Sequence, residues 1–171
     1  MVAFHDELFL GTRVRKKSAV DFSAFESPRF PKLATIGSEI KYHDVVKHMP
    51  RLRAGKRAID AMTTSMQYMD PKILRTEVTP IFPEELFTAE TLTSLDAILL
   101  TLYTSGTAPT QHTGFRTFLK RAREKHTPIF AITEREDAAL KLDAYESGKE
   151  MKAAGVIWCG DLTPEAATVK I

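Results

Sequence analysis

The sequence predicts an α/β protein in which helices flank a small parallel sheet, preceded by a short β-hairpin and an irregular segment. Residues 71–171 alternate short apolar runs with amphipathic stretches, which is the pattern of βαβ units. Residues 1–70 instead mix short strand-like runs with prolines and glycines. We therefore expect a β-hairpin and connecting segment over residues 1–70 and an α/β domain over residues 71–171.

The first part of the chain carries brief strand signals. The runs VAF, ELFL and RVRK fit short antiparallel strands, with turns at residues 5–7 and 11–12. The following segment ESPRFPKLATIGS, residues 26–38, contains two prolines and a glycine. This composition predicts a loop.

From Ile73 onward the pattern becomes regular. An apolar run at 96–103 (DAILLTLY) has no polar alternation, which predicts a strand buried on both faces. Three further strands are predicted at 72–78, 128–133 and 155–158, and a helical region at 83–95. Because strands and helices alternate, right-handed crossovers and a parallel sheet are expected.

Three helices complete the predicted α/β domain. The first has an apolar face at helical spacing, formed by Phe115, Phe118, Leu119, Ala122 and His126. A second helix is predicted to begin at Ser147, which stands at capping-box spacing from Glu150, and to end at Gly155. The last begins at Thr163, with Pro164 in its first turn.

The composition excludes several classes of function. A formal net charge of +2 gives no indication of nucleic-acid or membrane binding. The single cysteine, Cys159, excludes an internal disulfide, and the apolar runs are too short to span a bilayer. The five histidines lack metal-ligand spacing, and the loop TSGTAPT lacks the lysine of a phosphate loop. We expect a soluble, cytoplasmic protein without metal or cofactor.

Polar residues follow two neighbouring strands of the predicted sheet. The loop Tyr103–Thr107 follows one strand, and Thr133, Glu134 and Arg135 follow the next. Both loops should meet at the carboxyl edge, where α/β proteins bind ligands. Hydroxyls, a carboxylate and a guanidinium at this edge suit a zwitterionic amino acid as ligand. The alternative, polar loop ends without a catalytic role, stays open.

Several segments of the chain resemble a known family in order. They are LFLGTRVRKKSAVDFSAFESPRFPKLATIG, LTLYTSGTAPT, PIFAIT and YESGKEMKAAGVIWCGDLTPEAATVK. They are similar to the interdomain segment and C-terminal domain of bacterial type I (cytoplasmic) L-asparaginases. The resemblance implies a flavodoxin-like C-terminal domain, a homo-oligomer with sites between subunits, and hydrolysis of L-asparagine to L-aspartate and ammonia.

The sequence also departs from the family pattern. Members carry catalytic threonines in loops of the types TGGT and HGTD, upstream of the matched segments, and neither occurs here. The resemblance thus implies a chain shortened at both ends. Thr107 replaces an asparagine of the family, and Thr133, Glu134 and Arg135 replace its Ser-Gln-Cys.

A relocated site is therefore the leading hypothesis for catalysis. The candidate nucleophiles are Thr104, Ser105 and Thr107, with Glu134 or Lys16 as the base; the candidate substrate contacts are Tyr103, Gly106, Thr133 and Arg135. Two alternatives stay open: an inactive amino-acid-binding or oligomerisation module, and one half of a split asparaginase.

Overall fold

The computed structural model describes residues 1–49, 70–133 and 145–171. Its second half is built on a four-stranded sheet in the order β10-β9-β8-β7. The strands are β7 (Ile73–Glu77), β8 (Ala97–Leu102), β9 (Ile129–Thr133) and β10 (Ile157–Trp158). Each neighbouring pair is parallel, which confirms the predicted small parallel sheet.

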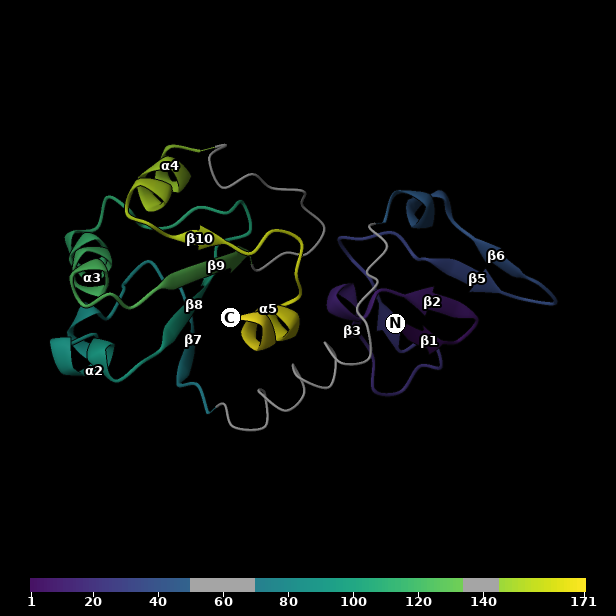
Figure 1. Cartoon of the computed structure of the whole chain (residues 1–171). Helices are drawn as coiled ribbons and strands as arrows, with labels where there is room; N and C mark the ends of the chain where they lie inside the picture. The colour runs from purple at the N-terminus through teal and green to yellow at the C-terminus, as the bar shows by residue number, and fades with distance from the viewer. Residues whose placement is uncertain (50–69, 134–144) are drawn as a thin grey trace.

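Helices cover both faces of this sheet. They are η3 (Glu84–Leu86), α2 (Ala89–Thr93), α3 (Thr113–Glu124), α4 (Glu146–Ala153) and α5 (Pro164–Lys170). Figure 1 shows α2, α3 and α4 on one face and α5 on the other. The last helix begins as the sequence predicts, because the Thr163 hydroxyl accepts a hydrogen bond from the Ala166 amide.

The central strand β8 divides the hydrophobic core into two clusters. All six of its residues are buried, as the continuous apolar run predicts. Alternate side chains face opposite ways along a strand. Leu100 accordingly packs with Phe115 and Phe118 of α3 in the larger cluster, whereas Leu99 packs with Ala167 of α5 in the smaller one.

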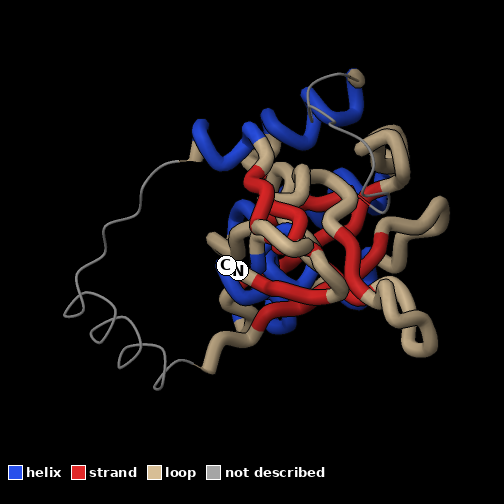
Figure 2. The backbone as a smooth tube through the Cα atoms, turned by 90° about the vertical axis from the view of Figure 1, so that its right-hand side faces the viewer, coloured by secondary structure: helices blue, strands red, loops and turns tan. Residues whose placement is uncertain are grey.

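The N-terminal part forms a separate antiparallel sheet in the order β1-β2-β5-β6. Its strands are β1 (Val2–Phe4), β2 (Glu7–Phe9), β5 (Ala34–Ile36) and β6 (Ile40–Tyr42). The short strands β3 (Arg15–Lys16) and β4 (Phe25–Glu26) pair with each other, and the 3₁₀ turns are η1 (Gly11–Arg13) and η2 (Asp44–His48). Figure 2, viewed from the right-hand side of Figure 1, shows these strands in front of the helices.

One segment of this sheet contradicts the sequence prediction. Residues 26–38 were expected to form a loop, yet β5 lies within them and pairs with both β2 and β6. The cause is tertiary: Leu33 and Ala34 are buried, and their burial outweighs the turn-forming residues on either side. The predicted β1–β2 hairpin is confirmed, with His5 and Asp6 at positive φ in its turn.

Two helix-end predictions are also wrong. The helix α4 begins at Glu146 with Tyr145 as N-cap, so Ser147 lies inside the first turn and caps nothing. The helix α3 ends at Glu124, and His126 takes a left-handed φ of 57° with an exposed side chain. His126 is therefore a turn residue that does not pack on the apolar face. By contrast, Gly155 has a φ of 92° just past α4, as a helix-ending glycine should.

Two further predictions concern the chain as a whole. The proposed boundary at residue 70 adjoins residues 50–69, which lie outside the described part, so it stays a prediction. Among the helices that the structure describes, none has the length and apolar character needed to cross a bilayer.

Candidate active site

The candidate site lies at the carboxyl edge of the parallel sheet. The pairing register sets Leu102 of β8 beside Thr133 of β9, and Trp158 of β10 beside Ala131. The three strands therefore end close together, and the loops that follow them share one edge. This is the edge at which open α/β sheets bind their ligands.

The loop after β8 is a tight turn closed by two backbone hydrogen bonds. The Gly106 amide donates to the Tyr103 carbonyl at 2.7 Å, and the Tyr103 amide donates to the Thr107 carbonyl at 3.1 Å. Gly106 has a φ of 74°, a conformation that glycine adopts without strain. The turn presents Thr104 on its exposed side and keeps Ser105 and Thr107 half-buried.

Two hydroxyl groups of this loop are bonded to each other. The Ser105 and Thr107 oxygens lie 2.9 Å apart, and either one can be the donor. Both groups are neutral, so the contact orients them but does not make either one a stronger nucleophile. Within residues 1–49, 70–133 and 145–171, no basic or acidic side chain bonds to either hydroxyl. The Ser105 and Thr107 hydroxyls can therefore donate hydrogen bonds to a ligand in place of the bond between them.

Tyr103 opens the loop and packs its ring against the larger core cluster. Its hydroxyl is inaccessible to solvent and has no hydrogen-bond partner among the described residues. Burial raises the pKa of Tyr103 above its usual value, because ionisation would place a charge in a poorly solvated position. The side chain is thus a protonated donor that finds no acceptor in residues 1–49, 70–133 and 145–171.

The hydroxyl of Thr133 is held by an arginine from the N-terminal part. Thr133 is 1% exposed, and Arg29 Nη2 donates to its hydroxyl at 2.6 Å and to its carbonyl at 3.2 Å. Arg29 Nη1 donates to the Gly160 carbonyl at 3.2 Å, just past β10. One guanidinium therefore joins the ends of β9 and β10. The sequence predicted that Thr133 contacts the substrate; in the structure its hydroxyl accepts a hydrogen bond from Arg29.

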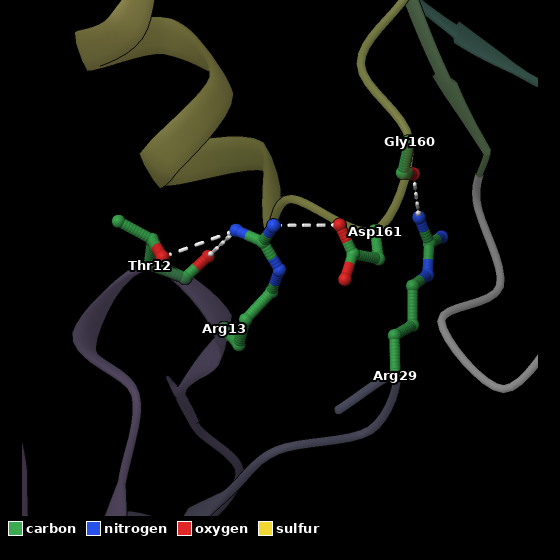
Figure 3. A network of polar contacts seen from close by, with 5 residues as sticks. All are labelled: Thr12, Arg13, Arg29, Gly160 and Asp161. Atoms are coloured by element: carbon green, nitrogen blue, oxygen red, sulfur yellow. Dashed lines mark hydrogen bonds and ion pairs between the residues drawn. The ribbon is translucent and has the colours of Figure 1, made fainter. Parts of the chain in front are cut away.

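A second arginine binds the same loop beside it. Arg13 Nη2 lies 2.6 Å from a carboxylate oxygen of Asp161, and its Nη1 donates to the hydroxyl and carbonyl of Thr12. Figure 3 shows both arginines reaching from the N-terminal segment to residues 160 and 161. We call Arg13 and Arg29 the arginine pair. Together they fasten the antiparallel sheet to the carboxyl edge of the parallel one.

Of the three remaining predicted residues, Lys16 is the one that the structure describes. Lys16 lies in β3 with an exposed side chain, and no hydrogen bond or ion pair of the described residues joins it to the loop after β8. Glu134 and Arg135 lie outside the described residues, so their roles as base and substrate contact stay predictions. No group of three or more potential metal ligands occurs in the described part of the chain.

The sequence reasoning missed the arginine pair as a structural unit. Arg29 reaches partners 104 and 131 positions away, a separation that no local pattern can indicate. Arg13 and Asp161 did stand among the positions that carry the family resemblance. That both residues belong to the resemblance was the sequence signal that could have linked them. The structure shows that they form an ion pair.

Comparisons with known proteins agree with this architecture. Residues 61–171 match the family Glutaminase/Asparaginase C-terminal domain, and residues 1–47 match Asparaginase, N-terminal. The L-asparaginase of Thermococcus kodakarensis is 32% identical over 99% of this chain and 48% of that protein. The 60 kDa lysophospholipase of Mus musculus is 29% identical over 98% of this chain and 28% of that protein.

Solved structures show the same likeness. The thermostable L-asparaginase from Thermococcus kodakarensis superposes with a TM-score of 0.76 at 29% identity, covering 98% of this chain and 48% of that one. L-asparaginase I from Vibrio cholerae gives a TM-score of 0.74 at 28% identity over the same shares. The chain spans about half the length of these asparaginases. The chain belongs to the glutaminase/asparaginase family.

Proposed function

We propose that the chain is an L-asparaginase, which hydrolyses L-asparagine to L-aspartate and ammonia without a metal or cofactor. We further propose that it is of the type I, cytoplasmic class and works as a homo-oligomer. Family membership supports the amide substrate, and the likeness to L-asparaginase I from Vibrio cholerae supports the class. The observation that carries the proposal is the hydroxyl-bearing turn at the carboxyl edge.

The turn offers groups that suit asparagine. The Ser105 and Thr107 hydroxyls can donate to the substrate's α-carboxylate or side-chain carbonyl once they exchange their mutual bond. Gly106 lets the chain make this tight turn at a φ of 74°, and the turn holds the two hydroxyls side by side. Thr133 contributes indirectly, because its bond to Arg29 fixes the end of β9 beside the turn.

For the chemical step we propose Ser105 or Thr107 as the nucleophile, with Glu134 as the base. A hydroxyl needs a neighbouring base to attack an amide carbon, and the amide nitrogen needs a proton as it leaves as ammonia. The carboxylate takes the hydroxyl proton as the oxygen–carbon bond forms and returns it to the nitrogen as the carbon–nitrogen bond breaks and ammonia leaves. A water then hydrolyses the resulting ester, which releases L-aspartate and restores the hydroxyl. Lys16 is the weaker choice of base, because it lies in β3 and no hydrogen bond or ion pair of the described residues joins it to the turn.

Turnover by single-hydroxyl variants tests this assignment. Ser105→Ala and Thr107→Ala should each lower kcat for asparagine by about 10²-fold, the usual scale for a removed catalytic group. Thr117→Ala is the matched control, because it removes a half-buried hydroxyl whose one bond to the described residues goes to the Thr113 carbonyl within α3. It should leave kcat unchanged. Wild-type rates in both loop variants would eliminate the turn as the source of the nucleophile.

A second candidate function is a binding half-site whose nucleophile comes from another polypeptide or segment. It is favoured by the mutual bond of Ser105 and Thr107, which leaves both hydroxyls without a base in the described part of the chain. L-aspartate at 100 times its Kd would then stabilise the fold by about 2.7 kcal/mol, while asparagine released no ammonia. An unchanged Tm across millimolar L-aspartate and L-asparagine would exclude this function.

A further inference from the structure

Figure 1 shows α3 and α4 on the face of the sheet opposite α5. Residues of these two helices line a groove. It consists of a cavity of about 470 Å³ near Thr110 and a cavity of about 340 Å³ near Ile129. The two cavities share four lining residues, Leu119, Arg123, Ala153 and Ala154. We call them together the α3–α4 groove. One end of the groove, which we call its far end, adjoins Ile129, the first residue of β9. The candidate active site adjoins Thr133, the last residue of the same strand.

The groove carries an excess of positive charge. Arg116, Lys120 and Arg123 line it at helical spacing along one stripe of α3. His126 lines its far end, and Glu150 of α4 is the one carboxylate in the lining of either cavity among the described residues. With the histidine neutral, three cations and one carboxylate leave about two net positive charges.

These cations differ in how well they are already paired. Arg116 donates to the Thr110 carbonyl and to Gln111, and lies 3.9 Å from Glu150. Lys120 lies 3.9 Å from Glu124, but both side chains are largely exposed, so this pair is weak. Arg123 stands between the two cavities and makes no side-chain hydrogen bond or ion pair within the described part of the chain. Its guanidinium is therefore available to a ligand.

The walls and floor of the groove are apolar beneath these charges. Leu119, Ala153 and Ala154 line both cavities where they adjoin, and Pro128 and Ile129 line the end near β9. Both volumes fall within the range of small-molecule sites, which combine an apolar lining with a few polar anchors. A ligand that fits needs an anionic head at Arg123 and a compact apolar body.

We propose that the α3–α4 groove binds a small phosphate monoester that carries an apolar group. A phosphate monoester bears about two negative charges at neutral pH, which matches the excess of positive charge in the lining. Its oxygens also suit the two-pronged donation of an arginine better than a single alcohol or amide would. A carboxylate would bring one charge only. The site is distinct from the candidate active site and does not depend on the proposed amide hydrolysis.

Calorimetric titration of the folded chain with monomeric octyl phosphate tests the proposal. We expect saturable binding of one molecule per chain. Arg123→Gln should weaken it at least about tenfold, since it removes a charge-assisted contact. Arg121→Gln is the matched control, because Arg121 has the same charge on α3 but lines neither cavity, and it should bind as wild type does.

Two further ligands test the contributions of the phosphate group and of the apolar chain separately. Inorganic phosphate and octanol should each bind at least about tenfold more weakly than octyl phosphate, because each lacks one half of the match. No saturation by octyl phosphate, or equal affinity in the Arg123→Gln variant, would overturn the proposal. So would inorganic phosphate binding as tightly as the ester, or co-sedimentation with phosphatidic acid vesicles in the absence of any binding to the monomeric ester.

Discussion

Replacing Arg29 with alanine would remove the link between the N-terminal part and the carboxyl edge of the parallel sheet. To the described residues the side chain makes three hydrogen bonds, two to Thr133 and one to the Gly160 carbonyl. Thr133 is almost completely buried, and Arg29 itself is half-buried. Without Arg29, the oxygens of Thr133 and Gly160 lose their hydrogen-bond donors, and water can replace these donors only in part.

The expected loss of stability follows from these contacts. Hydrogen bonds to a charged group contribute about 1.5–3 kcal/mol each when they are protected from water. Since water can enter part of the space left by Arg29, we expect the three bonds together to contribute about 2–4 kcal/mol to the free energy of unfolding. For a chain of this length, that loss lowers the Tm by roughly 5–15 °C. Arg29→Lys should restore less than half, because one ammonium cannot span both strand ends.

Urea unfolding of matched variants measures the effect. Arg15→Ala is the control, because Arg15 also belongs to the N-terminal part, but its ion pair with Glu26 is substantially exposed. Exposed pairs contribute about 0–1 kcal/mol. The combination of Arg29→Ala with Thr133→Val should show a coupling energy of about 1–2 kcal/mol. A loss for Arg29→Ala within about 0.5 kcal/mol of the Arg15→Ala value would refute the structural role given to Arg29.

Three further outcomes are expected. Phe118→Ala should cost about 3–5 kcal/mol in urea unfolding, because Phe118 is fully buried, whereas Phe22→Ala, at an 88% exposed site, should cost little. Burial raises the pKa of Tyr103, so the free energy of unfolding should fall as pH rises above about 10, and Tyr103→Phe should reduce that fall. Burial likewise raises the pKa of Cys159, so a disulfide reagent at pH 8 should modify it at least about tenfold more slowly than free cysteine; equal rates would contradict this.

The parallel sheet was predictable because its signals are local. The unbroken apolar run of β8 and the apolar face of α3 each identify an element within a dozen residues. The parallel direction of the strands follows from the alternation of strands and helices, because a strand reached through a crossover helix runs parallel to the strand before it. Glycine at Gly155 and threonine at Thr163 marked helix ends because their backbone and side-chain chemistry acts on adjacent residues.

The features that were missed depend on distant partners. The strand β5 forms because Ala34 pairs with Leu8 and Tyr42, a pairing that outweighs the loop-like composition around it. The place of Thr133 at the candidate site was predictable from its position after a strand, but its bond to Arg29 was not. Ser147 is not the cap because α4 begins earlier, at Glu146 with Tyr145 as its N-cap, two residues before the predicted cap. Local sequence patterns locate helix ends only to within a few residues.

The most direct test of the proposed function is ammonia release from L-asparagine across the fractions of a gel-filtration run of the purified chain. The chain has a mass of 19.2 kDa, so activity can be compared with its own peak by mass spectrometry. We predict that activity follows this peak at an oligomeric mass and falls about 10²-fold in Ser105→Ala. A folded chain that releases no ammonia in any fraction would contradict catalysis by this polypeptide alone.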